Sequence, residues 1–220
     1  MSKGIFIVGT GTDVGKTYVS GLLVKNLRKK GINAGYFKAA ASGNLWEDGK
    51  LVPGDAALVN RISGMKGNLD EMIPYVYERA VSPHLASQLE GNPVSLDVVK
   101  ECYYRISQKH EYMVVEGSGG VLCPIRYDEQ KIWQEDIIKL LNLDTLLVAD
   151  AGLGTINGIG LSAYYMKSRQ IKVKGILMNR CHPGNQMEQD NIKMVEELTG
   201  IPVIAQIEEG DQELAFLFTP

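Results

Sequence analysis

A glycine-rich turn near the start of the chain constrains its fold more than any other feature. The apolar run 5–8 ends at Gly9, and residues 9–17 have the sequence Gly-Thr-Gly-Thr-Asp-Val-Gly-Lys-Thr, after which a helical pattern begins. Glycines in such a turn allow backbone N–H groups to converge on an anion, and the next helix directs its positive dipole end to the same place. The order of strand, glycine-rich loop and helix predicts a phosphate-binding loop in an α/β fold.

The last two residues of this turn carry the chemistry of a nucleotide site. Lys16 can reach the β- and γ-phosphates, and the Thr17 hydroxyl can ligate Mg²⁺. The loop is one residue longer than the strict G-x-x-x-x-G-K-[ST] pattern, because five residues separate Gly9 from Gly15. The alternative is a glycine-rich surface turn with an incidental lysine, which the strand before and the helix after it disfavour.

Length and charge narrow the class of protein. The 220 residues are enough for one sizeable α/β domain, which we expect to span residues 1–220. A net charge of −3 gives no electrostatic reason to bind nucleic acid or an anionic membrane. No apolar run approaches the roughly 20 residues of a membrane span, and the chain begins with a strand pattern instead of a secretory signal. The three cysteines form no C-x-x-C pair, which favours a cytoplasmic protein with reduced thiols.

Strand and helix patterns alternate along the chain. Residues 17–30 are helical in pattern and residues 34–37 form a strand, which together make a βαβ unit. Further strands are expected at about 112–116, 145–149, 175–178 and 202–206. Residues 44–54 are expected to be a flexible polar loop and residues 72–77 an edge strand. The pattern predicts a mostly parallel sheet of about seven strands with helices on both faces.

Polar residues that follow the strands are candidates for the site, because ligands of open α/β sheets bind beyond the carboxyl ends of the strands. Lys38 follows the strand 34–37, and Glu116 ends the strand 112–116 just before several glycines. A carboxylate in this place is typical of a site that holds Mg²⁺, and the glycines leave room for phosphates. Asp55 opens a short helix, where it is either an N-cap or a further Mg²⁺ ligand.

Two later segments are candidates for the base and for a second anion. Asn179 and Arg180 follow a strand, and an asparagine amide can pair with the edge of adenine. GTP-binding domains place an aspartate three residues after this asparagine, whereas this chain has His182, which favours ATP over GTP. An adenine could rest just past the last strand, against Glu208, Glu209 and Gly210. Residues 152–158 form a second glycine-rich helix N-terminus, which suits a carboxylate or phosphate.

Several motifs occur in an order that resembles one family. They are Gly9–Thr17, Phe37-Lys38, Ala41-Ser42-Gly43, Asp55-Ala56, Ser82-Pro83-His84, Val114–Gly120, Leu153–Asn157 and Asn179. Over about residues 4–210 the chain resembles the dethiobiotin synthetases, ATP-dependent enzymes of biotin synthesis with a single-domain P-loop NTPase-like fold. The resemblance implies ATP and Mg²⁺ as cofactors. Many nucleotide-binding proteins share the phosphate loop, but the lysine–serine pair, Glu-Gly-x-Gly-Gly and Leu-Gly-x-Ile-Asn together are far more specific.

The resemblance also implies a reaction. The 7-amino group of 7,8-diaminononanoate takes up CO₂ to give a carbamate, and the γ-phosphoryl group of ATP moves to the carbamate oxygen. The 8-amino group then attacks this mixed anhydride, which closes a cyclic urea and releases phosphate. Small molecules are thus the expected partners: the diamine, CO₂ or bicarbonate, and ATP.

The same resemblance assigns roles to matching residues. Lys38 matches the lysine placed against both the carbamate and the γ-phosphate, and Lys16 matches the phosphate-loop lysine. Thr12 and Ser42 match groups that bind the diamine or its carbamate. The residues that match the Mg²⁺ set are Thr17, Asp55 and Glu116. Further implied nucleotide contacts are Asp13, which stands where glutamate is common, and Val14, Gly15, Gly117, Ser118, Gly119, Asn179, Arg180, Glu208, Glu209 and Gly210.

A homodimer is implied as well. In the family the far carboxylate of the substrate is held at a helix N-terminus of the partner subunit, and the matching residues here are Leu153, Gly154 and Asn157.

Three other classes of protein share parts of this pattern. Partitioning and cell-division switch ATPases usually carry an extra lysine five residues before the phosphate-loop lysine, where this chain has Gly11. They often end in a basic amphipathic helix, whereas residues 214–220 have no basic face. An amidotransferase acting on a cobalamin precursor would need a glutaminase domain, for which no residues remain. A nucleoside kinase is the third alternative.

Overall fold

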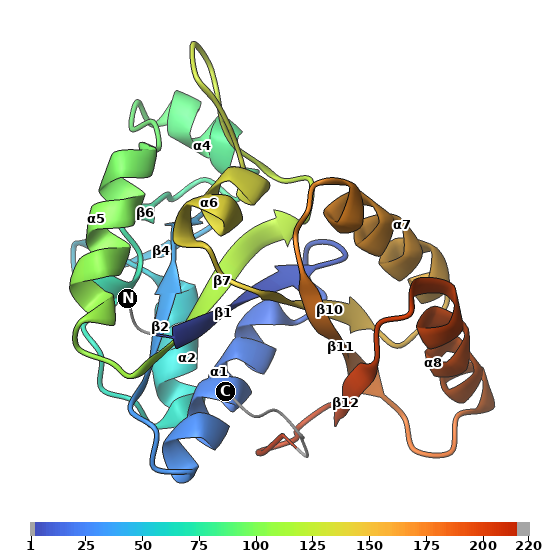
Figure 1. The fold of residues 1–220 in the computed structure, drawn as a ribbon. Helices are drawn as coiled ribbons and strands as arrows, with labels where there is room; N and C mark the ends of the chain where they lie inside the picture. Colours follow the sequence, from blue (N-terminus) through green and yellow to red (C-terminus); the bar gives the residue numbers. More distant parts are fainter. Residues whose placement is uncertain (1–2, 215–220) are drawn as a thin grey trace.

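Six parallel strands form the central sheet of the computed structural model, which describes residues 3–214 (Figure 1). Each neighbouring pair of strands in this sheet is parallel, so all six carboxyl ends lie at one edge. The order across the sheet is β12 (Val203–Glu208), β11 (Val173–Cys181), β10 (Thr145–Asp150), β1 (Lys3–Gly9), β7 (Tyr112–Gly120) and β2 (Ala34–Lys38). The apolar stretches of the central strands are buried, as continuous apolar runs predict for a parallel sheet.

Helices cover both faces of this sheet, as the alternating pattern predicts. On one face α1 (Lys16–Lys29) packs closely against α2 (Gly54–Ser63), and a Cβ atom at Gly21 would lie 2.9 Å from Ile62 Cβ. On the other face the Phe37 ring of β2 meets Tyr103 of α5 (Leu96–Ser107) edge to face at 5.5 Å. Right-handed crossovers place three more helices on this second face: α6 (Gln134–Leu141), α7 (Thr155–Ser168) and α8 (Gln186–Thr199).

Two expectations for the region between β2 and β7 are wrong. Residues 44–54 contain a hairpin of β4 (Leu45–Glu47) and β5 (Lys50–Val52), whose Asp-Gly turn has the positive φ angles that suit a two-residue hairpin loop. The expected edge strand at 72–77 is reduced to β6 (Tyr75–Val76), which pairs with β3 (Ala40–Ala41) outside the central sheet. Among the described residues the sheet therefore has six strands instead of about seven.

The remaining short elements are α3 (Leu69–Met72), α4 (Pro83–Leu89), β8 (Pro124–Tyr127) and β9 (Lys131–Trp133). Among them α3 packs against α5, and the others pack against one another. Within residues 3–214, no helix combines the length and the apolar character that a membrane crossing needs.

Candidate active site

The phosphate loop joins β1 to α1 at the carboxyl edge of the sheet. Gly15 is the N-cap of α1 and has a left-handed backbone, with φ of 86°. Lys16 is buried, and its Nζ donates to the Gly11 carbonyl at 2.8 Å, so the side chain folds back across the loop. Burial lowers the pKa of Lys16 to about 8, although the nearby Glu116 opposes the shift. The phosphates of a bound nucleotide would place negative charge beside the Lys16 ammonium and so favour its protonated form.

Lys38 and Glu116 are direct neighbours, because they stand opposite each other in the register of β2 and β7. The Lys38 ammonium lies 2.8 Å from Glu116 Oε1 and 2.7 Å from Asp55 Oδ2, and both Lys38 and Glu116 are buried. Burial by itself would lower the pKa of Lys38, but the two carboxylates overcome it and hold this pKa above its ordinary value. The side chain is therefore a permanent cation at this edge of the sheet.

Thr17 links the loop to the same two carboxylates. Its hydroxyl lies 3.1 Å from Asp55 Oδ1 and 2.9 Å from Glu116 Oε1. Asp55 does not cap its helix, because the N-cap of α2 is Pro53 and no side-chain cap bond is present. Burial would raise the pKa of Asp55, but Lys38 and the Thr17 hydroxyl together lower it below its ordinary value. The structure thus brings Thr17, Asp55 and Glu116 to one point beside Lys38.

The donor set at this point fits a hard divalent cation. Carboxylate and hydroxyl oxygens are the ligands that Mg²⁺ takes, with the remaining positions filled by water and phosphate. Across residues 3–214, no group of three or more His, Cys, Asp and Glu side chains could hold a metal. Asp55 and Glu116 would therefore need the Thr17 hydroxyl and the phosphates of a nucleotide to complete a metal site.

The glycines at the end of β7 are required by close packing around the loop. A Cβ atom at Gly117 would lie 2.4 Å from Gln134 Oε1, and one at Gly120 would lie 3.3 Å from the Thr10 carbonyl. Gly119 has a φ of 59°, and its Cβ position is 3.7 Å from Thr12 Oγ1. The Ser118 hydroxyl is already engaged, since it donates to the Ala40 carbonyl at 2.8 Å. The end of β7 therefore presents backbone to the loop, with Thr12 beside it.

The end of β11 supports the phosphate loop from behind. Asn179 is buried, and its Nδ2 donates to the Val14 carbonyl at 3.0 Å. Arg180 donates to the Asp13 carbonyl and forms an ion pair with Asp150, a residue to which sequence analysis assigned no role. The strand pattern could not indicate this support of the loop by Asn179 and Arg180, because the loop and β11 are more than 160 residues apart.

Other predicted residues lie around the edge of this site. Ser42 donates to the Val81 carbonyl at 2.6 Å. The turn 208–211 closes on itself through the Glu208 N–H and the Asp211 carboxylate, and the Asp211 carbonyl accepts a hydrogen bond from Tyr18 of α1. This turn is therefore held against the first turn of the helix that follows the phosphate loop.

The N-terminus of α7 is close to the phosphate loop and open to solvent. Gly154 is its N-cap, with φ of 91°, and the preceding Leu153 is 93% exposed. A Cβ atom at Gly158 would lie 3.6 Å from Thr10 Cβ, so the first turn of α7 adjoins the loop. A cavity of about 540 Å³ is lined here by Leu153, Gly154, Ile156, Asn157, Gly160, Leu161, Asn191 and Leu198.

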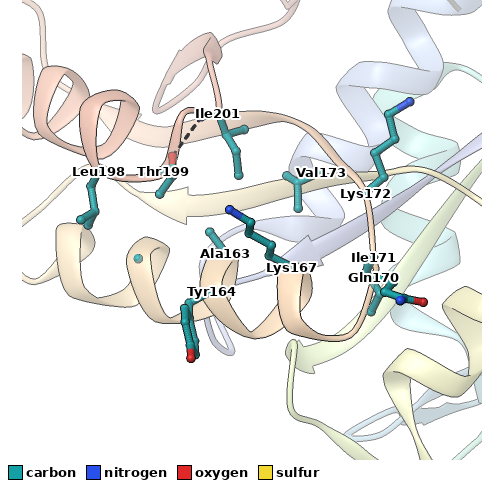
Figure 2. Close-up of a pocket in the computed structure, with 11 residues that line it drawn as sticks. Ala163, Tyr164, Lys167, Gln170, Ile171, Lys172, Val173, Leu198, Thr199 and Ile201 are labelled. Atoms are coloured by element: carbon teal, nitrogen blue, oxygen red, sulfur yellow. Dashed lines mark hydrogen bonds between the residues drawn. The ribbon is translucent and has the colours of Figure 1, made fainter.

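A second cavity, of about 640 Å³, lies further along α7 and α8 (Figure 2). The Lys167 side chain of α7 extends toward Ile201, and the Ile201 N–H donates to Thr199 Oγ1 (Figure 2). Its lining includes neither the phosphate loop nor the residues around Lys38. This second cavity is therefore separate from the candidate site, which is marked by its clustered charges.

The fold and the loop together define a P-loop nucleotide-binding protein, and comparison with known proteins agrees. A family model described as an AAA domain matches residues 3–213. The septum site-determining protein MinD of Pyrococcus horikoshii, solved with Mg-ADP, has a TM-score of 0.55 at 16% identity, over 95% of this chain and 82% of its own. A ParA family ATPase of Chlorobium tepidum has a TM-score of 0.59 at 12% identity, over 96% of this chain and 86% of its own. These two likenesses show the fold alone.

Sequence relatives are much more similar. The chain is 52% identical to the ATP-dependent dethiobiotin synthetase of Brachyspira hyodysenteriae, over 96% of this chain and 94% of that protein. The proteins of the same name from Clostridium novyi and Clostridium perfringens are 49% and 43% identical, over 94% and 96% of this chain and 87% and 95% of theirs. The chain belongs to the ATP-dependent dethiobiotin synthetases, a family of ligases, which confirms the resemblance seen in its motifs.

Proposed function

We propose that this protein, as a single-domain enzyme, converts 7,8-diaminononanoate, CO₂ and ATP into dethiobiotin, ADP and phosphate. The carbamate formed at the 7-amino group attacks the γ-phosphorus, and ADP leaves. The 8-amino group then attacks the carbonyl carbon of the mixed anhydride, and phosphate leaves as the ring closes. The observation that carries this proposal is the gathering of Lys38, Thr17, Asp55 and Glu116 beside the phosphate loop.

Charge neutralisation is the main demand of such a reaction. A carbamate and a triphosphate are both anionic, and phosphoryl transfer depends chiefly on positioning and on cations that offset the developing charge. Lys16, which follows β1, and Lys38, which ends β2, would supply two ammonium groups from either side of β7. When bound, Mg²⁺ would add further positive charge at the phosphates, held by Thr17, Asp55 and Glu116.

Lys38 acts in this proposal as a fixed cation and not as a base. Its raised pKa keeps it protonated at neutral pH. In the structure the Lys38 ammonium forms ion pairs with Asp55 and Glu116. It becomes available to the carbamate and the γ-phosphate only when these carboxylates have another cation to bind, which couples metal binding to substrate binding.

The remaining matched residues complete the site in this proposal. The backbone of residues 13–15 and of residues 117–119 surrounds the phosphates, and the turn 208–210 with Asn179 and Arg180 adjoins the adenine. Thr12 and Ser42 contact the diamine or its carbamate. Thr12 lies beside Gly119, which supports its place near the reacting groups.

The enzyme should depend on both amino groups of its substrate. With ATP, Mg²⁺ and bicarbonate, we expect phosphate release and dethiobiotin formation in equal amounts when 7,8-diaminononanoate is added. The control substrate is 8-aminononanoate, which lacks the 7-amino group and cannot close the ring. Coupled phosphate detection and mass spectrometry measure the two products. ATP turnover that ignores the diamine would contradict the proposal and favour a switch ATPase of the MinD or ParA type, whose fold this chain shares.

We further propose that two copies of the chain associate through α7, so that the N-terminus of this helix binds the carboxylate of a substrate held by the partner. Asn157, Leu161 and Tyr164 of α7 follow helical spacing and therefore share one face, and the exposed Leu153 precedes the N-cap of this helix. Of these, Leu161 is 63% exposed and Tyr164 is 76% exposed. Leu161 and Tyr164 thus form an exposed apolar stripe on α7, and such a stripe is typical of an interaction surface.

Substituting an aspartate into this stripe should separate the subunits. Leu161→Asp is expected to give a monomer in sedimentation velocity at micromolar concentration, with a KM for the diamine raised at least 10-fold, because a buried unpaired charge opposes association. The matched control is Val98→Asp, an exposed apolar residue of α5. Dimers that persist in Leu161→Asp, or a monomeric parent protein, would contradict this interface.

A further inference from the structure

Tyr36 lies behind the pair formed by Lys38 and Glu116. It is fully buried, and its hydroxyl donates to Glu116 Oε2 at 2.9 Å. The other carboxylate oxygen, Oε1, contacts Lys38 Nζ and Thr17 Oγ1. The two oxygens of Glu116 thus have separate partners, one toward the interior of the protein and one toward the phosphate loop.

The geometry of the sheet places these three side chains together. Tyr36 and Lys38 are two residues apart on β2, so both side chains leave the strand on the same face. Glu116 stands opposite Lys38 in register on β7 and shares that face. Lys38 is nearer the carboxyl edge and Tyr36 is one step deeper, so the tyrosine reaches the carboxylate from inside.

The hydroxyl of Tyr36 is a reliable donor. Burial, together with the neighbouring carboxylates of Glu116 and Asp55, holds the pKa of Tyr36 well above its ordinary value. Without the Tyr36 hydroxyl, Glu116 Oε2 would lose this hydrogen-bond partner, and the carboxylate could rotate toward Lys38.

We propose that Tyr36 is a positioning residue that fixes the Glu116 carboxylate with Oε1 directed at the phosphate loop. This inference rests on the proposed role of Glu116 as a metal ligand. Partners that orient a ligating side chain in this way typically change metal affinity 10–100-fold when they are removed. Tyr36 itself contacts neither substrate nor metal in this proposal, and it acts through Glu116.

The experiment measures Mn²⁺ binding to the full chain in the presence of ADP, by the electron paramagnetic resonance signal of free Mn²⁺. Tyr36→Phe removes only the hydroxyl and is expected to weaken Mn²⁺ binding about 10-fold. The matched control is Tyr77→Phe. Tyr77 is also fully buried, and its hydroxyl donates at 2.6 Å to the Asn92 carbonyl, which is not part of the site. Thermal unfolding of both variants shows whether each loses stability through its missing hydrogen bond.

The outcomes separate this inference from the proposed function. Weaker Mn²⁺ binding in Tyr36→Phe, with parent-like binding in Tyr77→Phe, supports the positioning role. Equal losses of melting temperature in both variants with parent-like Mn²⁺ binding would overturn it, because Tyr36 would then serve stability alone. Glu116→Gln is the reference for the metal role. Parent-like Mn²⁺ binding in Glu116→Gln would remove Glu116 from the proposed metal site, and the role of Tyr36 would be rejected with it.

Discussion

Lys38→Met is expected to lower kcat for dethiobiotin formation by about 10²–10³-fold, the typical loss when one group that stabilises transition-state charge is removed. Methionine has nearly the length of lysine but no charge, so the change removes the ammonium and little of the packing. The carbamate and the γ-phosphate would then meet with one cation fewer between them. Steady-state kinetics with saturating ATP and Mg²⁺ measure the effect.

The same substitution should also destabilise the protein when metal is absent. Loss of the ammonium leaves Glu116 and Asp55 close together and unpaired, and breaking a buried ion pair costs about 3–5 kcal/mol. Added Mg²⁺ and ADP should recover much of this loss in thermal unfolding, because a bound cation can replace the ammonium.

Lys109→Met is the matched control for Lys38→Met. Lys109 pairs with Glu71 at 2.7 Å on the protein surface, where an ion pair contributes little to stability. Parent-like kinetics and melting temperature are expected for this variant. Near-normal turnover in Lys38→Met, measured on folded protein, would remove Lys38 from its proposed catalytic role.

Gly15→Ala should lower the affinity for ADP at least 100-fold in isothermal titration calorimetry. Gly15 has a φ of 86°, and its added Cβ would lie 2.1 Å from Asn179 Nδ2, far inside van der Waals contact. The clash would displace either the loop or the asparagine that donates to the Val14 carbonyl. Because the phosphate loop binds through its converging N–H groups, a displaced loop loses several of these contacts at once.

Gly31→Ala separates backbone strain from the clash. Gly31 has a similar φ of 81°, but no atom lies within 4 Å of its Cβ position. Both variants should lose about 1 kcal/mol or more of stability from left-handed strain, but only Gly15→Ala should lose ADP binding. In the double variant Gly15→Ala with Asn179→Ala the clash is absent, and we expect part of the affinity to return. Parent-like ADP affinity in Gly15→Ala would show that the loop tolerates the displacement.

The hairpin of β4 and β5 stands where the sequence predicts a flexible loop. An Asp-Gly pair at residues 48–49 is a known signal for a two-residue turn, but the polar character of the segment led to the prediction of a loop. The predicted strand at 72–77 is longer than the observed β6 for a related reason. An apolar run indicates burial, but it does not say which strand the run pairs with.

Asp55 shows what residue patterns leave open within the site. From its position at the start of a helix, capping and metal binding were equally consistent. The structure rules out capping, because the packing of α2 against α1 carries the carboxylate to Thr17 and Lys38, and metal binding by Asp55 is part of the proposed function. The roles of Asn179 and Arg180 in supporting the loop, and of Asp150 in pairing with Arg180, depend in the same way on contacts between distant segments.

The sequence by itself determined the phosphate loop, the alternation of strands and helices, the parallel sheet and the family. These properties depend on local chemistry: glycine where the backbone must be left-handed, apolar runs where a strand is buried, and a lysine and a threonine at the start of a helix. Tertiary structure alone decided that Lys38 is held between two carboxylates, that Tyr36 reaches Glu116 from inside, and that β11 supports the loop. Those contacts arise from strand register and helix packing, which are set by the whole core and not by any neighbouring residues.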